Sequence, residues 1–391
     1  MAILISLSDC KIISPEKIMA ILTSGNIPKG GGIWTIENEL KPSDLFCYLY
    51  AKFGKPNGIQ NILRQDDSDN LIHWDWTLLH PCGLITFLGL NLRTEVHLIG
   101  NWNFPNCDRE QLIGSIKRDY AQFGKEMKRI RTELLEDWDM FVNPYFQLKD
   151  SITQLMIEIN DLKLNPEKDE ISEIPIHMNE TDFSKKWADT ARRYEKGFGL
   201  VMGVRAMTPV LAESFVNLLL YMLCRKDIKE NKRLYETTVR ANIDIKVQML
   251  HINCIGFKNA VDWASPECKR YNSVVNERND MLHGNVVIEK QKYGEIHFLG
   301  KVPIFKSYQN PWKQTIGVSM GASGMDRVDS DIAAVEAFIE YIQSNLELAV
   351  RKEVESLINR RDVGQNKKTG RLGILLPQHI VDFRMPRVST K

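Results

Sequence analysis

The chain has 391 residues, which is more than one ordinary core holds and fits two or three domains. Its hydrophobic fraction of 43% and charged fraction of 26% are typical of soluble globular proteins, and its formal net charge is only +1. Bulk charge therefore predicts no partner and excludes nucleic-acid binding through a uniformly basic surface, so any such surface must be a local patch.

The seven cysteines are scattered and form no CxxC pair, so neither a disulfide framework nor a ribbon-type zinc site is indicated. The amino terminus lacks a basic region and reaches Asp9 too early for a signal peptide. The strongest apolar run, residues 218–224, is too short to span a bilayer. We therefore expect a soluble, cytoplasmic protein with no membrane partner, no metal and no cofactor.

Residues 1–107 are expected to form a β-rich or α+β domain with a recognition role. The near alternation of β-branched and aromatic residues between positions 71 and 99 predicts short strands. Residues 15–22 and 43–53 are typical of short helices, and the second ends before Gly54.

Residues 108–164 are expected to be a helical connector, with one long helix before Pro144 and another beyond it. The lysines and arginines of the first helix either contact phosphates or belong to a solvated face with interleaved acidic residues. Residues 165–182 combine two prolines with six acidic side chains and predict a linker at the domain boundary.

Residues 183–361 are expected to form a bundle of four helices. Thr208 followed by Pro209 predicts a cap and a first helical position that open a helix at 210–224. Every face of this helix is apolar, so we expect it at the centre of the bundle. A second helix is expected from about residue 229 to about residue 256.

Ser265 followed by Pro266 predicts the start of a third helix, which ends at His283. Residues 286–304 favour a hairpin or an irregular excursion, and a flexible segment with three glycines follows. The last helix is expected at about 330–360, where apolar residues keep a three-four spacing that suits the bundle or a partner subunit.

Residues 362–391 are expected to form a basic tail. Eight lysines or arginines stand against two aspartates between positions 360 and 391, which is an electrostatic footprint for RNA or simply a solubilising tail. The candidates for contact with RNA are Lys367, Lys368 and Arg371.

An arginine interrupts the apolar stripe of the third helix. The stripe consists of positions spaced by three and four residues, which are Cys268, Tyr271, Val275, Arg278 and Leu282. A guanidinium there is costly unless it is paired, faces a cleft or lies at a subunit interface. Glu213, the one charged side chain of the predicted central helix, is a candidate for positioning it.

His283 follows Arg278 by an angle of about 140° around an ideal helix, so one straight helix does not aim both at the same atom. A frayed helix end, or a site shared between two symmetry-related subunits, resolves this difficulty. Asn279 lies one turn before His283 and is expected to hydrogen-bond to it and fix its tautomer. Asp280 is a further candidate for positioning either side chain.

These residue types suit cleavage of RNA without a metal. An imidazole takes a proton from the ribose 2′-OH or delivers one to the leaving 5′-oxygen, which contributes roughly a hundred- to ten-thousand-fold. An arginine supplies fixed donors to the developing phosphorane charge. We therefore predict an endoribonuclease in which Arg278 and His283 are catalytic and Asn279 orients the imidazole.

The segment Arg278-Asn279-Asp280-Met281-Leu282-His283 resembles the RNxxxH form of the Rx4-6H signature of HEPN domains (higher eukaryotes and prokaryotes nucleotide-binding). The run 212–215 resembles an acidic position on an earlier helix of that family. The resemblance covers about residues 183–361. It implies an all-α bundle that dimerises to build a composite site and leaves a 2′,3′-cyclic phosphate and a 5′-hydroxyl.

Such domains occur in toxin–antitoxin modules, abortive-infection systems and RNA-guided antiviral ribonucleases. The resemblance thus implies a toxin or antiviral defence effector that acts as a homodimer on RNA. The resemblance does not extend to residues 1–107, which we expect to recognise a trigger, a partner such as an antitoxin or a guide, or the RNA itself. The excursion at 286–324 departs from the compact members of the family.

The predicted fold class is thus α+β, with an N-terminal β-rich or α+β domain, a helical connector and a C-terminal all-α HEPN-like bundle. The alternative function is a non-catalytic HEPN-type dimerisation or nucleotide- or RNA-binding module, in which Arg278 pairs with Glu213 and His283 caps its helix. A third interpretation is a zinc enzyme built on four side chains of the N-terminal domain, His73, His80, Cys82 and His97.

Overall fold

The computed structural model describes residues 6–24, 30–60, 71–102, 109–171, 180–286 and 288–375. It is 60% helix and 16% strand, which confirms the α+β class. The chain divides into two compact units, one made of residues 1–141 and 362–391, the other of residues 142–361.

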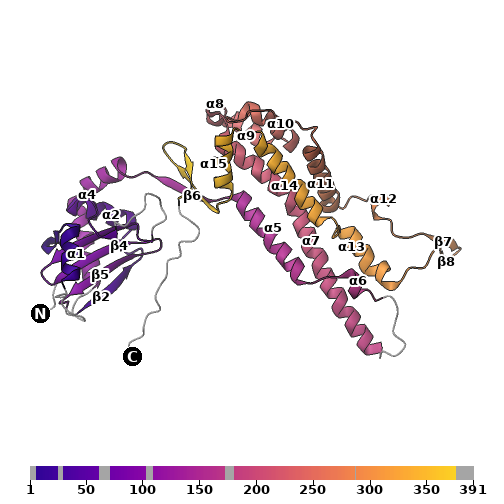
Figure 1. Ribbon diagram of the computed structural model, residues 1–391, viewed down its shortest axis with the longest axis horizontal. Coiled ribbons are helices and arrows are strands. Elements are labelled where there is room, and N and C mark those ends of the chain that lie inside the picture. Colours follow the sequence, from indigo (N-terminus) through magenta and orange to yellow (C-terminus); the bar gives the residue numbers. More distant parts are fainter. Residues whose placement is uncertain are drawn as a thin grey trace. The chain divides into compact units, whose positions relative to one another are not determined.

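A five-stranded antiparallel sheet forms the centre of the first unit (Figure 1). In spatial order its strands are β1 (Lys11–Ile12), β3 (Trp74–His80), β4 (Gly83–Gly89), β5 (Thr94–Gly100) and β2 (Gly31–Ile36). The register places Trp76 opposite Phe87 and Phe87 opposite Val96, and all three side chains are fully buried. Directly opposite residues of neighbouring strands point to the same face of a sheet, so these three side chains belong to one apolar layer.

Two helices, α2 (Pro42–Phe53) and α4 (Arg109–Glu133), cover that layer. The short helix η1 (Leu7–Asp9) and the helix α1 (Pro15–Thr23) precede them in the chain. α2 and α4 pack against each other and share a core with the sheet through residues such as Leu49 and Ile116. The helices and strands predicted for this part of the chain are therefore confirmed.

A second sheet of this unit has the order β10-β9-β6 and joins β6 (Trp138–Val142) to β9 (Asp362–Asn366) and β10 (Leu372–Gly373). The described part of the predicted basic tail, residues 362–375, is therefore a hairpin, and residues 376–391 lie outside the described residues. The predicted connector is divided, because α4 buries Leu112 and Ile130 in the core of the first unit while α5 (Pro144–Asp161) belongs to the second.

The second unit is built around α7 (Glu180–Leu223), a helix of 44 residues. At 1.5 Å per residue it is about 66 Å long. The helices packed along it are α5, α10 (Ile243–Asn253), α11 (Pro266–His283), α13 (Val318–Ser323) and α14 (Val328–Ser344), as Figure 1 shows. Phe215, Val216 and Leu219 are fully buried, which confirms the central position predicted for residues 210–224.

α7 is long and apolar enough to cross a membrane, and half of its most apolar 18-residue window is buried within the protein. Burial of this kind is also expected of the core helix of a bundle. Length and composition alone therefore do not distinguish a membrane-spanning helix from a core helix.

The helix start predicted at Thr208 is wrong, because α7 continues through Pro209. The Thr208 hydroxyl donates to the carbonyl of Val204 at 2.8 Å, a bond within the helix and not a cap at its start. Packing on several sides outweighs the one backbone hydrogen bond that proline cannot donate. The predicted linker 165–182 contains α6 (Pro166–Asp169) and the start of α7, and its residues 172–179 lie outside the described residues.

Two further predicted helices are interrupted. The one expected from about 229 to 256 is three helices, α8 (Lys226–Glu230), α9 (Lys232–Arg240) and α10. The side chain of Asn231 caps α9 by accepting from the Leu234 amide at 3.2 Å, which favours a new start there. The last helix is divided into α14 and α15 (Leu348–Ile358), with Leu346 bridged to Phe257 between them.

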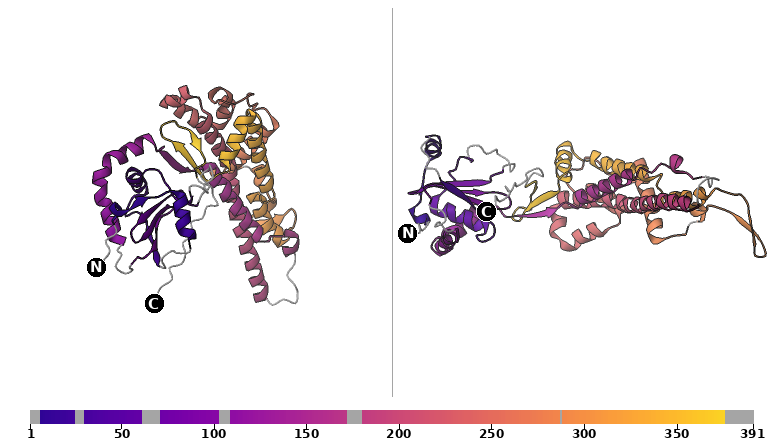
Figure 2. Two further views of the ribbon diagram at one scale, coloured as in Figure 1. Left: turned by 60° about the vertical axis from the view of Figure 1, so that its left-hand side comes forward. Right: turned by 90° about the horizontal axis from the view of Figure 1, so that it is seen from below.

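A two-stranded ribbon projects from the helices of this unit (Figures 1 and 2). It follows α12 (Ile288–Gln291) and consists of β7 (Ile296–Leu299) and β8 (Val302–Phe305), and every residue of both strands is exposed. The predicted hairpin is confirmed. The flexible segment predicted after it is wrong, since η2 (Lys313–Gly317) and α13 are helical and Ile316 packs in a small cluster with Tyr194.

Candidate functional site

The start of α11 follows the predicted local chemistry. Ser265 caps the helix by accepting from the Cys268 amide at 3.3 Å, and Pro266 occupies its first turn. Tyr271 stacks on Phe338 of α14 with centroids 4.1 Å apart, and its hydroxyl donates to the carbonyl of Pro209 at 3.3 Å. These contacts fix α11 against both α7 and α14.

Arg278 extends the buried side of α11 by two turns beyond Tyr271. Its Nη2 lies 3.4 Å from Oε1 of Glu213 on α7, and the two side chains are 19% and 34% exposed. Its Nε is buried and has no hydrogen-bond partner among the described residues. The structure thus brings Arg278 and Glu213 together, and it leaves guanidinium donors unused.

A lysine that sequence reasoning missed lies beside this pair. Lys246 of α10 is 8% exposed, and its Nζ donates to Oδ1 of Asn217, one turn beyond Glu213 on α7, at 2.9 Å. Burial lowers the pKa of Lys246, and the Glu213 carboxylate opposes this shift. Lys246 interrupts the apolar side of α10 next to Val247 and Leu250, the same signal that singled out Arg278.

The end of α11 is formed by Gly284, whose φ of 62° and ψ of 33° are left-handed. The Asn285 amide donates to the Asp280 carbonyl at 3.0 Å, and the Asn285 side chain donates to Oδ1 of Asp280 at 3.1 Å. Such a closure satisfies carbonyl groups that a helix end would otherwise leave open. His283, the last residue of the helix, is exposed.

Two expectations for this helix end are wrong. The apolar stripe ends before Leu282, which is 54% exposed. The hydrogen bond expected from Asn279 to His283 does not occur among the described residues. The turn is closed instead by the two hydrogen bonds that Asn285 donates to Asp280.

A second ionic cluster lies beside α11 and was not foreseen. Arg205 of α7 is 5% exposed and donates through Nε to Asp331 and through Nη2 to Glu277, both at 2.7 Å. Arg327 adds a second donor to Glu277 at 2.8 Å. Glu277 and Arg278 are adjacent in sequence, so α11 contributes to two separate networks.

A cleft of about 730 Å³ opens next to this cluster. Its lining includes Arg205, Glu277, Asp280 and Gly284 of the motif region and Arg327. Arg278 and His283 are outside the lining. The middle of the motif therefore lines the cleft through Asp280 and Met281, whereas its two candidate catalytic side chains do not.

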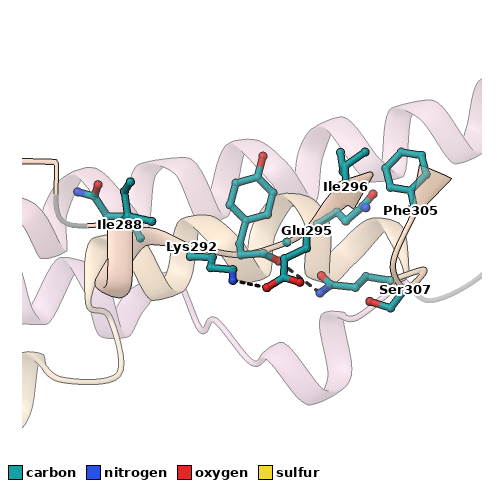
Figure 3. Close-up of a pocket in the computed structure, with 11 residues that line it drawn as sticks. Ile288, Lys292, Glu295, Ile296, Phe305 and Ser307 are labelled. Atoms are coloured by element: carbon teal, nitrogen blue, oxygen red, sulfur yellow. Dashed lines mark hydrogen bonds and ion pairs between the residues drawn. The ribbon is translucent and has the colours of Figure 1, made fainter. Parts of the chain in front are cut away.

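Another cavity, of about 340 Å³, lies at the base of the ribbon (Figure 3). Ile288, Ile296 and Phe305 form its apolar side, and Lys292 pairs with Glu295 at its edge. None of the side chains predicted to be catalytic lines it.

Two of the three basic residues predicted to bind RNA, Lys367 and Arg371, have acidic partners. Nζ of Lys367 lies 3.2 Å from Asp137 and 3.3 Å from Asp139, and the hydrogen bond to Asp137 raises the pKa of that lysine. Nη2 of Arg371 lies 3.6 Å from Glu136. The Lys368 amide donates to Oδ1 of Asn366 at 3.0 Å. The described part of the tail is therefore compensated by the carboxylates of residues 136–139.

The four side chains considered for zinc are not grouped. His73 contacts Asn91, His97 contacts Glu95 at 2.8 Å, and Nδ1 of His80 accepts from the Cys82 amide at 3.1 Å. Within the described ranges no three His, Cys, Asp or Glu side chains are placed to hold a metal ion.

Comparison of the chain with protein-family models, with curated proteins and with solved structures gave no match. The chemistry of the site therefore has to be argued from its own residues.

Proposed function

We propose that the protein is a metal-independent endoribonuclease of the HEPN type, with its site at the end of α11. The observation that supports this most directly is the state of Arg278. It has one long ion pair, to Glu213, and a buried Nε without a partner. A guanidinium with unused donors next to the last turn of a helix is suited to a phosphate.

In the proposed reaction the 2′-hydroxyl attacks the adjacent phosphorus. The imidazole of His283 in one subunit accepts the 2′ proton, and the imidazole of His283 in the second subunit delivers a proton to the departing 5′-oxygen. Arg278 donates to the non-bridging oxygens as negative charge builds on the phosphorane. The P–O5′ bond breaks, which leaves a 2′,3′-cyclic phosphate on one fragment and a 5′-hydroxyl on the other.

A homodimer is part of this proposal. Arg278 is directed toward Glu213 inside the unit, whereas His283 is exposed at the helix end. Two copies of α11 would supply the two imidazoles that the acid and base steps need. Asn279 remains the candidate for orienting the ring in such an assembled site, because residues four apart share a helix face.

The biological role that we propose is a toxin or abortive-infection effector in antiviral defence, acting in the cytoplasm. It rests on the resemblance of residues 278–283 to the HEPN motif. A reducing compartment agrees with the free thiols of all six described cysteines. The first unit would then bind a trigger, an antitoxin or a guide partner.

One observation favours a second candidate, a non-catalytic binding or dimerisation module. Glu213 already neutralises Arg278, and His283 lies at the carbonyl end of α11, where a cation is favourable in any helix. In that case both side chains have only structural roles.

An assay for cleavage of labelled tRNA and mRNA in the presence of EDTA distinguishes the ribonuclease from the non-catalytic module. We expect cleavage by the purified full-length protein and a loss of about a hundred-fold or more with His283→Ala. His251→Ala is the matched control, because His251 is likewise an exposed histidine near the end of a helix, α10. Equal activity of the two variants, or activity that EDTA abolishes, would exclude the mechanism.

A further inference from the structure

Two cysteines face each other where two helices end. Cys224 directly follows α7, and Cys254 directly follows α10 with an extended backbone. They are paired in an isolated antiparallel bridge. Both are free thiols, and they are 7% and 5% exposed.

The hydrogen bonds of the bridge define its type. The Arg225 amide donates to the Asn253 carbonyl at 2.8 Å, and the Ile255 amide donates to the Leu223 carbonyl at 2.9 Å. These bonds flank the two cysteines, which therefore form the pair without hydrogen bonds between them. In such a pair the Cα atoms are about 4.5 Å apart and the side chains are at their closest.

That spacing falls within the range of disulfides, whose Cα atoms are about 4.4 to 6.8 Å apart. The two backbones are held in place by their own hydrogen bonds. A bond between the sulfurs therefore needs side-chain rotation and no rearrangement of α7 or α10.

The surroundings keep the thiols protonated at rest. Burial raises the pKa of Cys254 to about 12, and the positive charge of Lys229 opposes this shift. Burial also raises the pKa of Cys224. The helix α8, only five residues long, carries Lys229, whose Nζ donates to the Tyr221 carbonyl at 2.5 Å. Brief opening of so short a helix would expose both sulfurs to a small oxidant.

We propose that Cys224 and Cys254 are an oxidative modification site that closes to an intramolecular disulfide with a low-molecular-weight disulfide such as oxidised glutathione. The Cys224 thiolate attacks one glutathione sulfur and releases the other as a thiol. The Cys254 thiolate then attacks Cys224 and releases the second glutathione thiol. Two cysteine thiols are oxidised, one glutathione disulfide is reduced, and the protons of the cysteines pass to the released thiols.

The crosslink would join the ends of α7 and α10 about two helical turns from the Asn217 to Lys246 hydrogen bond. It would close a loop of about 30 residues that contains α8, α9 and α10 and would restrict the unfolded chain. In a reducing cytoplasm such a bond is transient, which makes it a sensor of oxidation and not a permanent support. This inference does not depend on the proposed function.

The full-length protein should be equilibrated in glutathione buffers of increasing oxidation, quenched with acid and alkylated. We expect two of the seven thiols to be lost together, with a Cys224–Cys254 peptide on non-reducing mapping and full recovery on reduction. Cys254→Ser, and Cys254→Ala if the serine variant folds poorly, should abolish the paired loss.

Cys268→Ser is the matched control, because Cys268 is a buried thiol of the same unit, and it should leave the paired loss unchanged. Retention of all seven thiols in the most oxidising buffer would overturn the proposal. So would glutathione adducts without the internal bond, or loss that spreads over other cysteines.

Discussion

Asp331 of α14 accepts a hydrogen bond from Nε of Arg205 at 2.7 Å in a part of the bundle where the two side chains are only 10% and 6% exposed. Arg205 also donates to Glu277 and to the carbonyl of Ser323. One guanidinium therefore ties α7 to α11, α13 and α14. Loss of Asp331 would leave a buried guanidinium donor unsatisfied and Arg205 paired with Glu277 alone, a carboxylate that Arg327 shares.

Asp331→Ala leaves Nε of Arg205 without its acceptor and should lower the free energy of unfolding of the helical unit by about 1 to 3 kcal/mol. Asp189→Ala is the control, since Asp189 pairs with Arg192 on the exposed side of α7 and should contribute under about 0.5 kcal/mol. Urea unfolding followed by circular dichroism measures both. Similar midpoints for the two variants would contradict the role given to Arg205.

The left-handed residue after His283 sets a second prediction. A Cβ added at Gly284 meets no atom within 4 Å, so Gly284→Ala should cost only the conformational strain of φ 62°, about 1 kcal/mol. Gly199→Ala, at an exposed position inside α7, should instead stabilise by about 0.5 to 1 kcal/mol. The midpoint of thermal unfolding should therefore fall for Gly284→Ala and rise for Gly199→Ala. Midpoint shifts of the same sign in both variants would contradict this account.

The first unit should lose stability in acid through Asp119. Burial tends to raise the pKa of Asp119, but hydrogen bonds from Lys52 and from Tyr48 outweigh it and hold the pKa below its usual value. The unfolded chain then takes up the proton first, so stability is present above about pH 4 and is lost as the pH falls through the folded pKa.

Asp119→Asn should remove that part of the acid dependence and cost about 2 kcal/mol at neutral pH. Urea midpoints of the first unit, followed between about pH 6 and about pH 3, test this. Asp9→Asn, at an exposed position of η1 in the same unit, is the control. An unchanged slope for Asp119→Asn would show that other carboxylates govern acid unfolding.

A composite site predicts a particular dose response. If one imidazole is base and the other is acid, a dimer with one His283→Ala subunit is inactive, and activity falls with the square of the wild-type fraction. Wild-type and His283→Ala subunits that carry different tags can be mixed under conditions that allow exchange, and activity is then measured against the wild-type fraction. Light scattering gives the mass of the assembly in solution. A linear fall, or an active monomer, would contradict the dimer without excluding cleavage by a single chain.

Local chemistry predicted the boundaries of α11 from sequence. Ser265 and Pro266 act within one turn, and Gly284 supplies a backbone conformation that few residues adopt, so neither depends on the rest of the fold. The pairing of Arg278 with Glu213 also followed, because a charge on an apolar stripe needs a partner nearby in the bundle.

Features that depend on distant packing were not predicted. Pro209 lies inside a helix because neighbouring helices hold α7 on several sides, information that the dipeptide Thr208-Pro209 does not contain. The Arg205 cluster joins residues more than seventy positions apart, and no local spacing marks it. The bridge between Cys224 and Cys254 likewise exists only because α7 and α10 end side by side.

The β7–β8 ribbon exposes apolar side chains that add nothing to the core and favour association. Ile296 and Phe305 are opposite each other on one face, and Leu299 and Val302 on the other, so neither face is polar. Its sheet contains only these two strands among the described residues, which leaves both outer edges open to further strands. Lys301 lies at the tip of the ribbon and interrupts the apolar run. A charge at this position opposes the stacking of such ribbons into fibres.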